Sequence, residues 1–188
     1  MVRDTETTMS TGPKHPILIV DDEPDVLFSL KGLLRHDFEL HTADSGDQAL
    51  EVLRQHPIHV IMTDQRMPGM TGAQLMTRAK ALRPDAVRIV FTGYADIKAV
   101  IEAINTGGLY RYITKPWDPD ELIDILHHAA NRYDEDAAKI QFAADVKSFA
   151  NDVVQHVEAR DSNRDDSAAV KPLMDLGRSL AAQADVLF

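Results

Sequence analysis

Five short, mostly apolar runs, each followed by a stretch with helical spacing, constrain the fold of this chain more than any other feature. Runs that stay apolar instead of alternating with polar residues are typical of parallel strands, which helices cover on both faces. Parallel strands also need crossover connections of fixed hand. The pattern therefore predicts an α/β fold with a doubly wound five-stranded parallel sheet. The expected strands are Ile17–Val20, Phe38–Thr42, Ile58–Thr63, Val87–Thr92 and Leu109–Thr114.

The stretches between these runs carry start signals for helices. Pro24 stands in the first turn of an apolar stripe that continues to Leu34, a place where proline is tolerated. Ser45, with Gln48 three residues later, predicts a capping box, and Asp118 predicts an N-cap. Two further helices are expected, through Leu75–Leu82 and Asp96–Asn105.

Composition divides the chain into three segments. Residues 1–15 are rich in Thr, Ser, Gly and Pro without a hydrophobic period, and we predict that they are disordered. Residues 16–132 hold the alternating strands and helices. Residues 133–188 are expected to form a C-terminal extension of two amphipathic helices, with a break near the charged run at 161–167.

The composition also argues against several functional classes. The 188 residues include 20 Lys and Arg and 30 Asp and Glu, a formal net charge of −10 that disfavours binding to nucleic acid or to anionic membranes. Cysteine is absent, which excludes a thiolate metal site or nucleophile. No apolar run approaches the roughly 18 residues that cross a bilayer, and the polar, acidic start is wrong for a signal peptide. We therefore expect a cytoplasmic protein.

Polar residues follow the expected strands where each strand ends. Asp21 and Asp22 leave the first strand, Asp64 the third, Thr92 the fourth and Lys115 the fifth, so all five should meet at one edge of the sheet. Clustered carboxylates repel one another unless a cation is present, and hard oxygen ligands favour Mg²⁺. A lysine and a hydroxyl beside them suit a phosphoryl group under attack by a carboxylate.

These residues, with the Met-Pro-Gly turn that begins at Met67 and with Gly93 and Pro116, resemble the receiver domain of two-component response regulators. The resemblance covers roughly residues 15–132. It implies a flavodoxin-like sheet with strand order 2-1-3-4-5, as in CheY. In motif the chain is closest to receivers that precede HD-GYP phosphodiesterase domains or NtrC-type activator domains.

The resemblance implies a role for each residue of the site. Asp64 would accept a phosphoryl group from the phosphohistidine of a sensor histidine kinase. Asp22, Asp64 and the backbone carbonyl of Arg66 would hold Mg²⁺, with Asp21 acting mainly through water. Lys115 would pair with a phosphoryl oxygen, and its bond to Pro116 is expected to be cis.

Two further residues are expected to report phosphorylation. By resemblance, Thr92 closes on the phosphoryl group and Tyr112 is the switch aromatic that turns inward in response. The positions of Arg66 and Tyr94 tune dephosphorylation in receivers, and both residues are bulky here. We therefore expect restricted access of water and a long-lived phosphoryl-aspartate.

The extension decides the expected output. Residues 134–188 carry eleven acids and six Lys or Arg, and they are too few for a DNA-binding domain. The chain also lacks a phosphate-binding GxxxxGK[ST] loop and the His-Asp pair of a phosphohydrolase. We expect output by protein–protein contact or by dimerisation through residues 134–160, and no catalysis beyond the chain's own phosphorylation and dephosphorylation.

Three alternatives stay open at this stage. The two helices could instead pack as a hairpin on their own receiver. The chain could be a phosphorelay intermediate that takes its phosphoryl group from a kinase or a phosphotransfer protein and passes it to another histidine protein. A Mg²⁺ phosphatase of the haloacid dehalogenase type is disfavoured, because Asp21 is followed two positions later by Glu23 instead of a second aspartate.

Overall fold

A computed structural model describes residues 13–93 and 109–161, together with seven positions between 171 and 182. The chain forms two compact units, Met1–Tyr133 and Asp134–Phe188. The expected helix Asp96–Asn105 and the residue Tyr94 lie outside the described residues.

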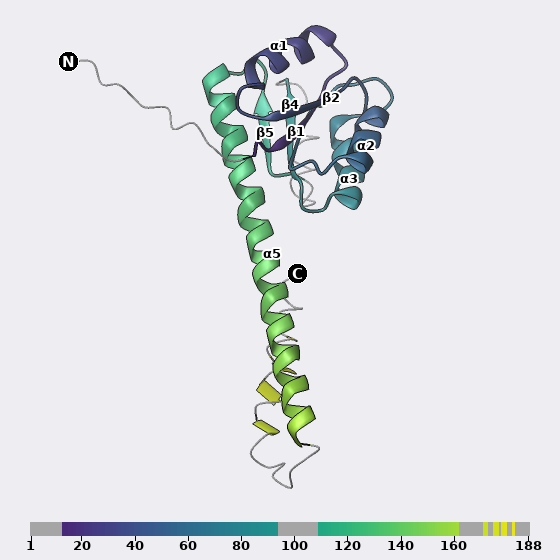
Figure 1. Ribbon diagram of the computed structural model, residues 1–188. Helices are drawn as coiled ribbons and strands as arrows, with labels where there is room; N and C mark the ends of the chain where they lie inside the picture. The colour runs from purple at the N-terminus through teal and green to yellow at the C-terminus, as the bar shows by residue number, and fades with distance from the viewer. Residues whose placement is uncertain are drawn as a thin grey trace, which may run out of the picture. The chain divides into compact units, whose positions relative to one another are not determined.

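The first unit is built on five parallel strands in the order β2-β1-β3-β4-β5, which confirms the predicted sheet (Figure 1). Each pair of neighbours is in parallel register, for example Ile17 with Leu40 on one side and with Val60 on the other. The strands are β1 (Pro16–Val20), β2 (Glu39–Ala43), β3 (Val60–Asp64), β4 (Val87–Thr92) and β5 (Arg111–Thr114).

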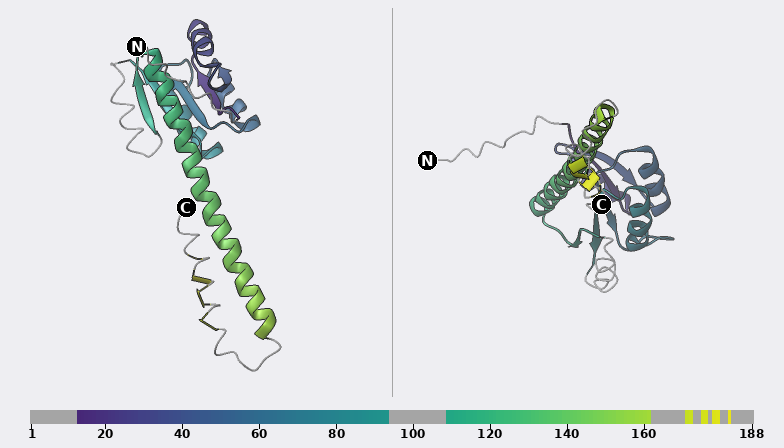
Figure 2. Two further views of the ribbon diagram at one scale, coloured as in Figure 1. Left: turned by 60° about the vertical axis from the view of Figure 1, so that its left-hand side comes forward. Right: turned by 90° about the horizontal axis from the view of Figure 1, so that it is seen from below.

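Helices cover both faces of this sheet. Figure 2 shows α1 and the first part of α5 on one side and α2 and α3 on the other. Alternate residues of β1 belong to the two layers, because Ile17 and Ile19 pack towards α1 and α5 while Leu18 and Val20 pack towards α2 and α3. All four are fully buried, which explains why the strand is apolar throughout. The helices are α1 (Pro24–Leu34), α2 (Gly46–Gln55), α3 (Gly72–Leu82) and α5 (Pro119–Asp161).

Three strands begin later than the sequence predicts, and the second does so by one residue, at Glu39 instead of Phe38. The third starts at Val60 instead of Ile58, because the amide of Ile58 donates to the carbonyl of His56 in a turn. The fifth starts at Arg111 instead of Leu109. The later start leaves β5 with four residues, at the edge of the sheet.

Of the two predicted helix caps, one is confirmed and the other is wrong. The Asp118 cap is confirmed, since its Oδ1 accepts hydrogen bonds from two backbone amides of the first turn of α5. The predicted capping box at Ser45 is wrong, because the Ser45 hydroxyl donates a charge-assisted hydrogen bond to the carboxylate of Asp44. The hydroxyl therefore makes no hydrogen bond to the first turn of α2. A complete capping box forms instead at Thr71 and Gln74 of α3.

The second unit holds the rest of α5, which continues to Asp161, and the described residues between 171 and 182 are also helical. Residues 162–170, which include most of the expected break, lie outside the described residues. Among the described residues, no helix has the length and apolarity that a membrane span requires.

Candidate functional site

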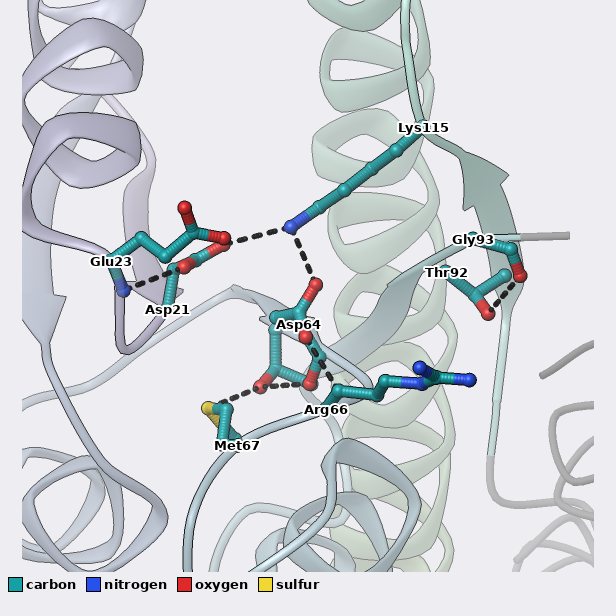
Figure 3. A network of polar contacts seen from close by, with 9 residues as sticks. Asp21, Glu23, Asp64, Arg66, Met67, Thr92, Gly93 and Lys115 are labelled. Atoms are coloured by element: carbon teal, nitrogen blue, oxygen red, sulfur yellow. Dashed lines mark hydrogen bonds and ion pairs between the residues drawn. The ribbon is translucent and has the colours of Figure 1, made fainter. Parts of the chain in front are cut away.

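An ammonium group and two carboxylates meet at the carboxyl edge of the sheet. Asp21 directly follows β1 and Asp64 ends β3, and because these strands are neighbours, the two carboxylates lie side by side. Lys115 follows β5 and reaches across them, as Figure 3 shows. Its Nζ lies 3.1 Å from Oδ2 of Asp21 and 2.5 Å from Oδ1 of Asp64.

Asp21 is held in place on every side. Its side chain is fully buried, and its Oδ1 accepts a hydrogen bond of 2.9 Å from the amide of Glu23, the residue before α1. Its own amide donates to the carbonyl of Ala43 at the end of β2. The turn from β1 into α1 therefore presents one buried carboxylate in a fixed orientation.

The loop after Asp64 is equally well fixed. The second oxygen of Asp64 accepts a hydrogen bond from the amide of Arg66 at 2.5 Å. The buried Gln65 donates through its amide to the carbonyl of Phe91, and it accepts from the amides of Gly72 and Ala73. These bonds tie the loop to β4 and to the start of α3.

Gly72 allows that close approach. A Cβ atom at this position would lie 2.3 Å from the carbonyl oxygen of Asp64, which is backbone and cannot move aside. The start of α3 can therefore pack under the Asp64 loop only with glycine at this position.

The charges of the site do not balance. Two carboxylates face one ammonium, which leaves one net negative charge in a largely buried place. Burial by itself would lower the pKa of the Lys115 ammonium, but hydrogen bonds and charge from Asp64 and Asp21 outweigh it and raise the pKa above its ordinary value. The ammonium therefore stays charged, and the remaining negative charge favours a further cation.

An aromatic wall stands beside Lys115. The rings of Phe91 and Trp117 are stacked with their centroids 4.7 Å apart. The Nζ of Lys115 lies 5.9 Å from the first centroid and 5.8 Å from the second, within the range of a cation–π interaction. The wall limits where the ammonium can go, so it favours the position between the carboxylates.

The two predicted switch residues lie apart from this cluster. Thr92 is fully buried at the end of β4, and its hydroxyl donates to the carbonyl of Gly93 at 3.0 Å (Figure 3). Tyr112, on β5, is 38% exposed. It lines a cavity of about 370 Å³ together with Trp117 and other residues of β5 and α5.

Two other predicted metal ligands are not among the residues that form ion pairs with Lys115. Asp22 is partly exposed next to Asp21, and Arg66 is exposed and contributes its amide. Among the described residues, no group of three or more His, Asp and Glu side chains is gathered closely enough to hold a metal. The donor set still fits Mg²⁺, because this ion commonly takes one or two carboxylates and keeps several waters.

Sequence reasoning missed the residues that shape the site without carrying charge. Gln65 and Gly72 fix the Asp64 loop, and Phe91 with Trp117 forms the aromatic wall. The polar Gln65 directly after a wholly apolar strand was the signal available in the sequence. Nothing in the sequence pairs Phe91 with Trp117, which are 26 positions apart and meet only across neighbouring strands.

Comparison with known proteins gives one family. Residues 17–127 match the model of the response regulator receiver domain. The hydrogenase transcriptional regulatory protein HoxA of Cupriavidus necator is 42% identical over 113 residues, which cover 60% of this chain and 23% of HoxA. The DNA-binding transcriptional regulator NtrC of Klebsiella pneumoniae is 31% identical over 118 residues, or 62% of this chain and 25% of NtrC.

The chain therefore spans about a quarter of the length of these two curated relatives. Among solved structures, the signal receiver domain of an HD domain-containing protein from Pseudomonas fluorescens Pf-5 has a TM-score of 0.64 at 32% identity. The match covers 70% of this chain and 98% of that chain.

Proposed function

The chain belongs to the response regulator receiver domain family, and from that premise we propose that Asp64 accepts a phosphoryl group from the phosphohistidine of a sensor histidine kinase. The observation that carries the proposal is the contact of Lys115 with both Asp21 and Asp64 at the carboxyl edge of the sheet. The contact supports the proposal, because transfer of a phosphoryl group to a carboxylate requires a cation beside it.

The transfer is a displacement at phosphorus. A carboxylate oxygen of Asp64 forms a bond to the phosphorus, the bond from phosphorus to the kinase imidazole breaks, and the imidazole keeps the electron pair. Lys115 moves from the carboxylate to a phosphoryl oxygen. The ammonium is already charged and within reach, so little reorganisation is needed.

A magnesium ion would be held by Asp21, Asp22, Asp64 and the backbone carbonyl of Arg66. When bound, it neutralises phosphoryl oxygens during the transfer. The net negative charge of the Asp21, Asp64 and Lys115 cluster supports this part of the proposal.

Phosphorylation would be read through Thr92 and Tyr112. The Thr92 hydroxyl exchanges the Gly93 carbonyl for a phosphoryl oxygen, which pulls the end of β4 towards Asp64. Tyr112 then turns inward from its exposed position. Because phosphorylation adds about −1.5 to −2 charges, it can bias two such arrangements.

The output we propose is contact with another protein, including a second copy of this chain through residues 134–160, without catalysis beyond the chain's own phosphorylation and dephosphorylation. The acidic 134–188 unit supports contact with protein in preference to nucleic acid. Passing the phosphoryl group on to another histidine protein is the second candidate within this class.

Labelling with acetyl phosphate and Mg²⁺ tests the proposal. We expect one phosphoryl group per chain, and we expect none in Asp64→Asn. Asp47→Asn, an exposed aspartate in the first turn of α2, is the matched control and should be labelled as the parent is. Repeated turnover of the phosphodonor that disappears in Asp21→Asn would overturn the proposal in favour of a phosphatase.

The lifetime of the phosphoryl-aspartate is a separate part of the proposal. Arg66 is exposed beside Asp64, where its side chain can restrict the approach of water. We expect the Arg66→Ala, Tyr94→Ala double variant to lose the phosphoryl group several-fold faster than the parent chain. An equal or slower loss in the double variant would contradict the shielding role.

A further inference from the structure

Gln65 is a buried polar residue that the proposed function does not use. It directly follows Asp64, the last residue of β3, and only 6% of its surface is exposed. The polar atoms of a side chain are rarely buried without hydrogen-bond partners, because leaving such a bond unmade costs free energy. The partners of Gln65 therefore show what a glutamine achieves at this position that an apolar residue would not.

Three hydrogen bonds of Gln65 reach two other elements. Its backbone amide donates to the carbonyl of Phe91 on β4 at 3.0 Å. Its backbone carbonyl accepts from the amide of Gly72 at 3.1 Å, and its side-chain Oε1 accepts from the amide of Ala73, also at 3.1 Å. Gly72 and Ala73 are the first two residues of α3, where backbone amides have no acceptor within the helix. Gln65 therefore supplies both acceptors and fastens the start of α3 to the end of β3.

These bonds fix the peptide unit between Gln65 and Arg66. Its carbonyl oxygen accepts from Gly72, and its N–H, the amide of Arg66, donates to the Asp64 carboxylate at 2.5 Å (Figure 3). Because both polar atoms of this planar unit are bonded, only the two backbone torsions of Arg66 separate it from the next carbonyl. That next carbonyl, on Arg66, is the backbone ligand proposed above for Mg²⁺.

The side chain of Gln65 is the part of this arrangement that depends on the residue type. Most residues at position 65 could form the two backbone bonds, but only a side chain with an acceptor at the same reach can bond Ala73. Without that acceptor, the start of α3 can move away from the Asp64 loop. The amide of Gly72 directly precedes Ala73 and would move with it, which would release the fixed peptide unit.

We infer that Gln65 is a positioning residue for the metal, because through Ala73 and Gly72 it holds the Arg66 carbonyl in the place where Mg²⁺ would use it. The inference rests on the proposed function, in which that carbonyl and the neighbouring carboxylates hold the ion. Groups that orient metal ligands typically change metal affinity by about 10- to 100-fold. Since the carboxylates stay in place here, we expect an effect near the lower limit, about tenfold.

Gln74 offers a matched comparison at the same end of α3. Its Oε1 accepts from the amide of Thr71 at 3.1 Å, and its own amide donates to the hydroxyl of Thr71 at 3.3 Å. Gln74 is exposed, and these two bonds reach Thr71, not the peptide unit beside Asp64. Loss of either glutamine should therefore loosen the start of α3, whereas only loss of Gln65 should change the affinity for Mg²⁺.

Binding of Mn²⁺ to the full chain, followed by electron paramagnetic resonance of the unbound ion, tests the inference. Mn²⁺ prefers the same oxygen ligands as Mg²⁺, and competition with Mg²⁺ gives the affinity for that ion. We expect Gln65→Met, which keeps the length of the side chain without an acceptor oxygen, to bind Mg²⁺ about tenfold more weakly than the parent. Gln74→Met should bind it within about twofold of the parent, although both variants should unfold at lower urea concentrations.

Two further measurements separate positioning from a general loosening of the fold. Labelling of Asp64 by acetyl phosphate should need about tenfold more Mg²⁺ for half of its maximal rate in Gln65→Met, and no more than the parent in Gln74→Met. Gln65→Glu keeps an acceptor oxygen at the same reach and adds a negative charge, so it should bind Mg²⁺ at least as tightly as the parent.

Unchanged Mg²⁺ affinity in Gln65→Met, or equal weakening in Gln65→Met and Gln74→Met, would overturn the inference alone. If the parent takes no phosphoryl group, or if Asp64→Asn binds Mn²⁺ as tightly as the parent, the proposed function fails and the inference fails with it. Equal helical signal in circular dichroism shows that the variants are folded. If Gln65→Met loses that signal, Gln65→Asn decides instead, since its carboxamide is one methylene too short to reach Ala73.

Discussion

Polar side chains meet at both edges of the sheet, but they interact differently at each edge. At the carboxyl edge, Asp21 and Asp64 converge on Lys115. At the amino edge, His15 and His59 precede β1 and β3, and their Nδ1 atoms lie 3.0 Å apart. Parallel strands bring polar side chains together at both ends, so topology alone does not separate a reactive site from a structural one.

The amino edge is closed by ring contacts and by a hydrogen bond from a phenol to a carboxylate. The ring of His59 is stacked on Tyr133 of α5 with the centroids 3.9 Å apart, and the hydroxyl of Tyr133 donates to Asp85 at 3.2 Å. The carboxyl edge keeps a surplus of negative charge and a nearby ammonium. The difference teaches that uncompensated charge, more than polarity, distinguishes the edge suited to chemistry from the edge that holds α5 to the sheet.

The largest predicted effect separates the two edges directly. Lys115→Ala should slow acetyl phosphate labelling of Asp64 tenfold or more, because the charge that stabilises the transferring phosphoryl group is removed (an estimate of about 2–4 kcal/mol for such a group). His59→Ala should leave the labelling rate within about twofold, since its contacts lie at the opposite edge. A similar slowing in both variants would break the comparison.

Substitutions at the amino edge should lower the stability of the fold, although they leave the labelling rate nearly unchanged. His59→Ala removes the Tyr133 stack and the contact with His15, and we expect the free energy of unfolding in urea to fall by about 1–3 kcal/mol. Tyr133→Phe keeps the stack and loses the bond to Asp85, so about 0.5–1.5 kcal/mol should be lost. Equal losses in the two variants would show that the stack contributes nothing.

The carboxyl edge also predicts a dependence on pH. The folded chain raises the pKa of Lys115 above its ordinary value of 10.5, so this contribution to stability is fully present below 10.5 and is lost as pH rises through the higher folded value. We expect the stability difference between the parent and Lys115→Gln to stay level up to about pH 10 and to shrink above it. A difference that grows with alkaline pH would contradict the ion pairs.

The smallest predicted effect is a change in tryptophan fluorescence. Trp117 is the single tryptophan of the chain and its ring stands beside the ammonium of Lys115. Beryllofluoride with Mg²⁺, a phosphoryl mimic, should therefore change the tryptophan emission of the parent chain and should leave that of Asp64→Asn unchanged. An identical response in His59→Ala would sharpen the comparison, because it would show that the amino edge takes no part in the signal.

Much of the receiver unit could be predicted from the sequence. The family resemblance and the strand order are confirmed, because continuous apolar runs and turn residues are local signals that the tertiary structure did not override. Ser45 shows where local signals fail, since its hydroxyl had a second partner one residue away. The roles of Asp64, Thr92 and Tyr112 stay predictions that the labelling and fluorescence experiments address.

By itself, the sequence determined that Asp21, Asp64 and Lys115 lie at one edge of a parallel sheet, because each directly follows or ends an apolar strand. Only the tertiary structure decided that Lys115 bridges both carboxylates and that Phe91 and Trp117 form a wall beside it. The physical reason is that strand order along an edge follows from chain pattern, whereas distances between side chains depend on packing across strands far apart in sequence.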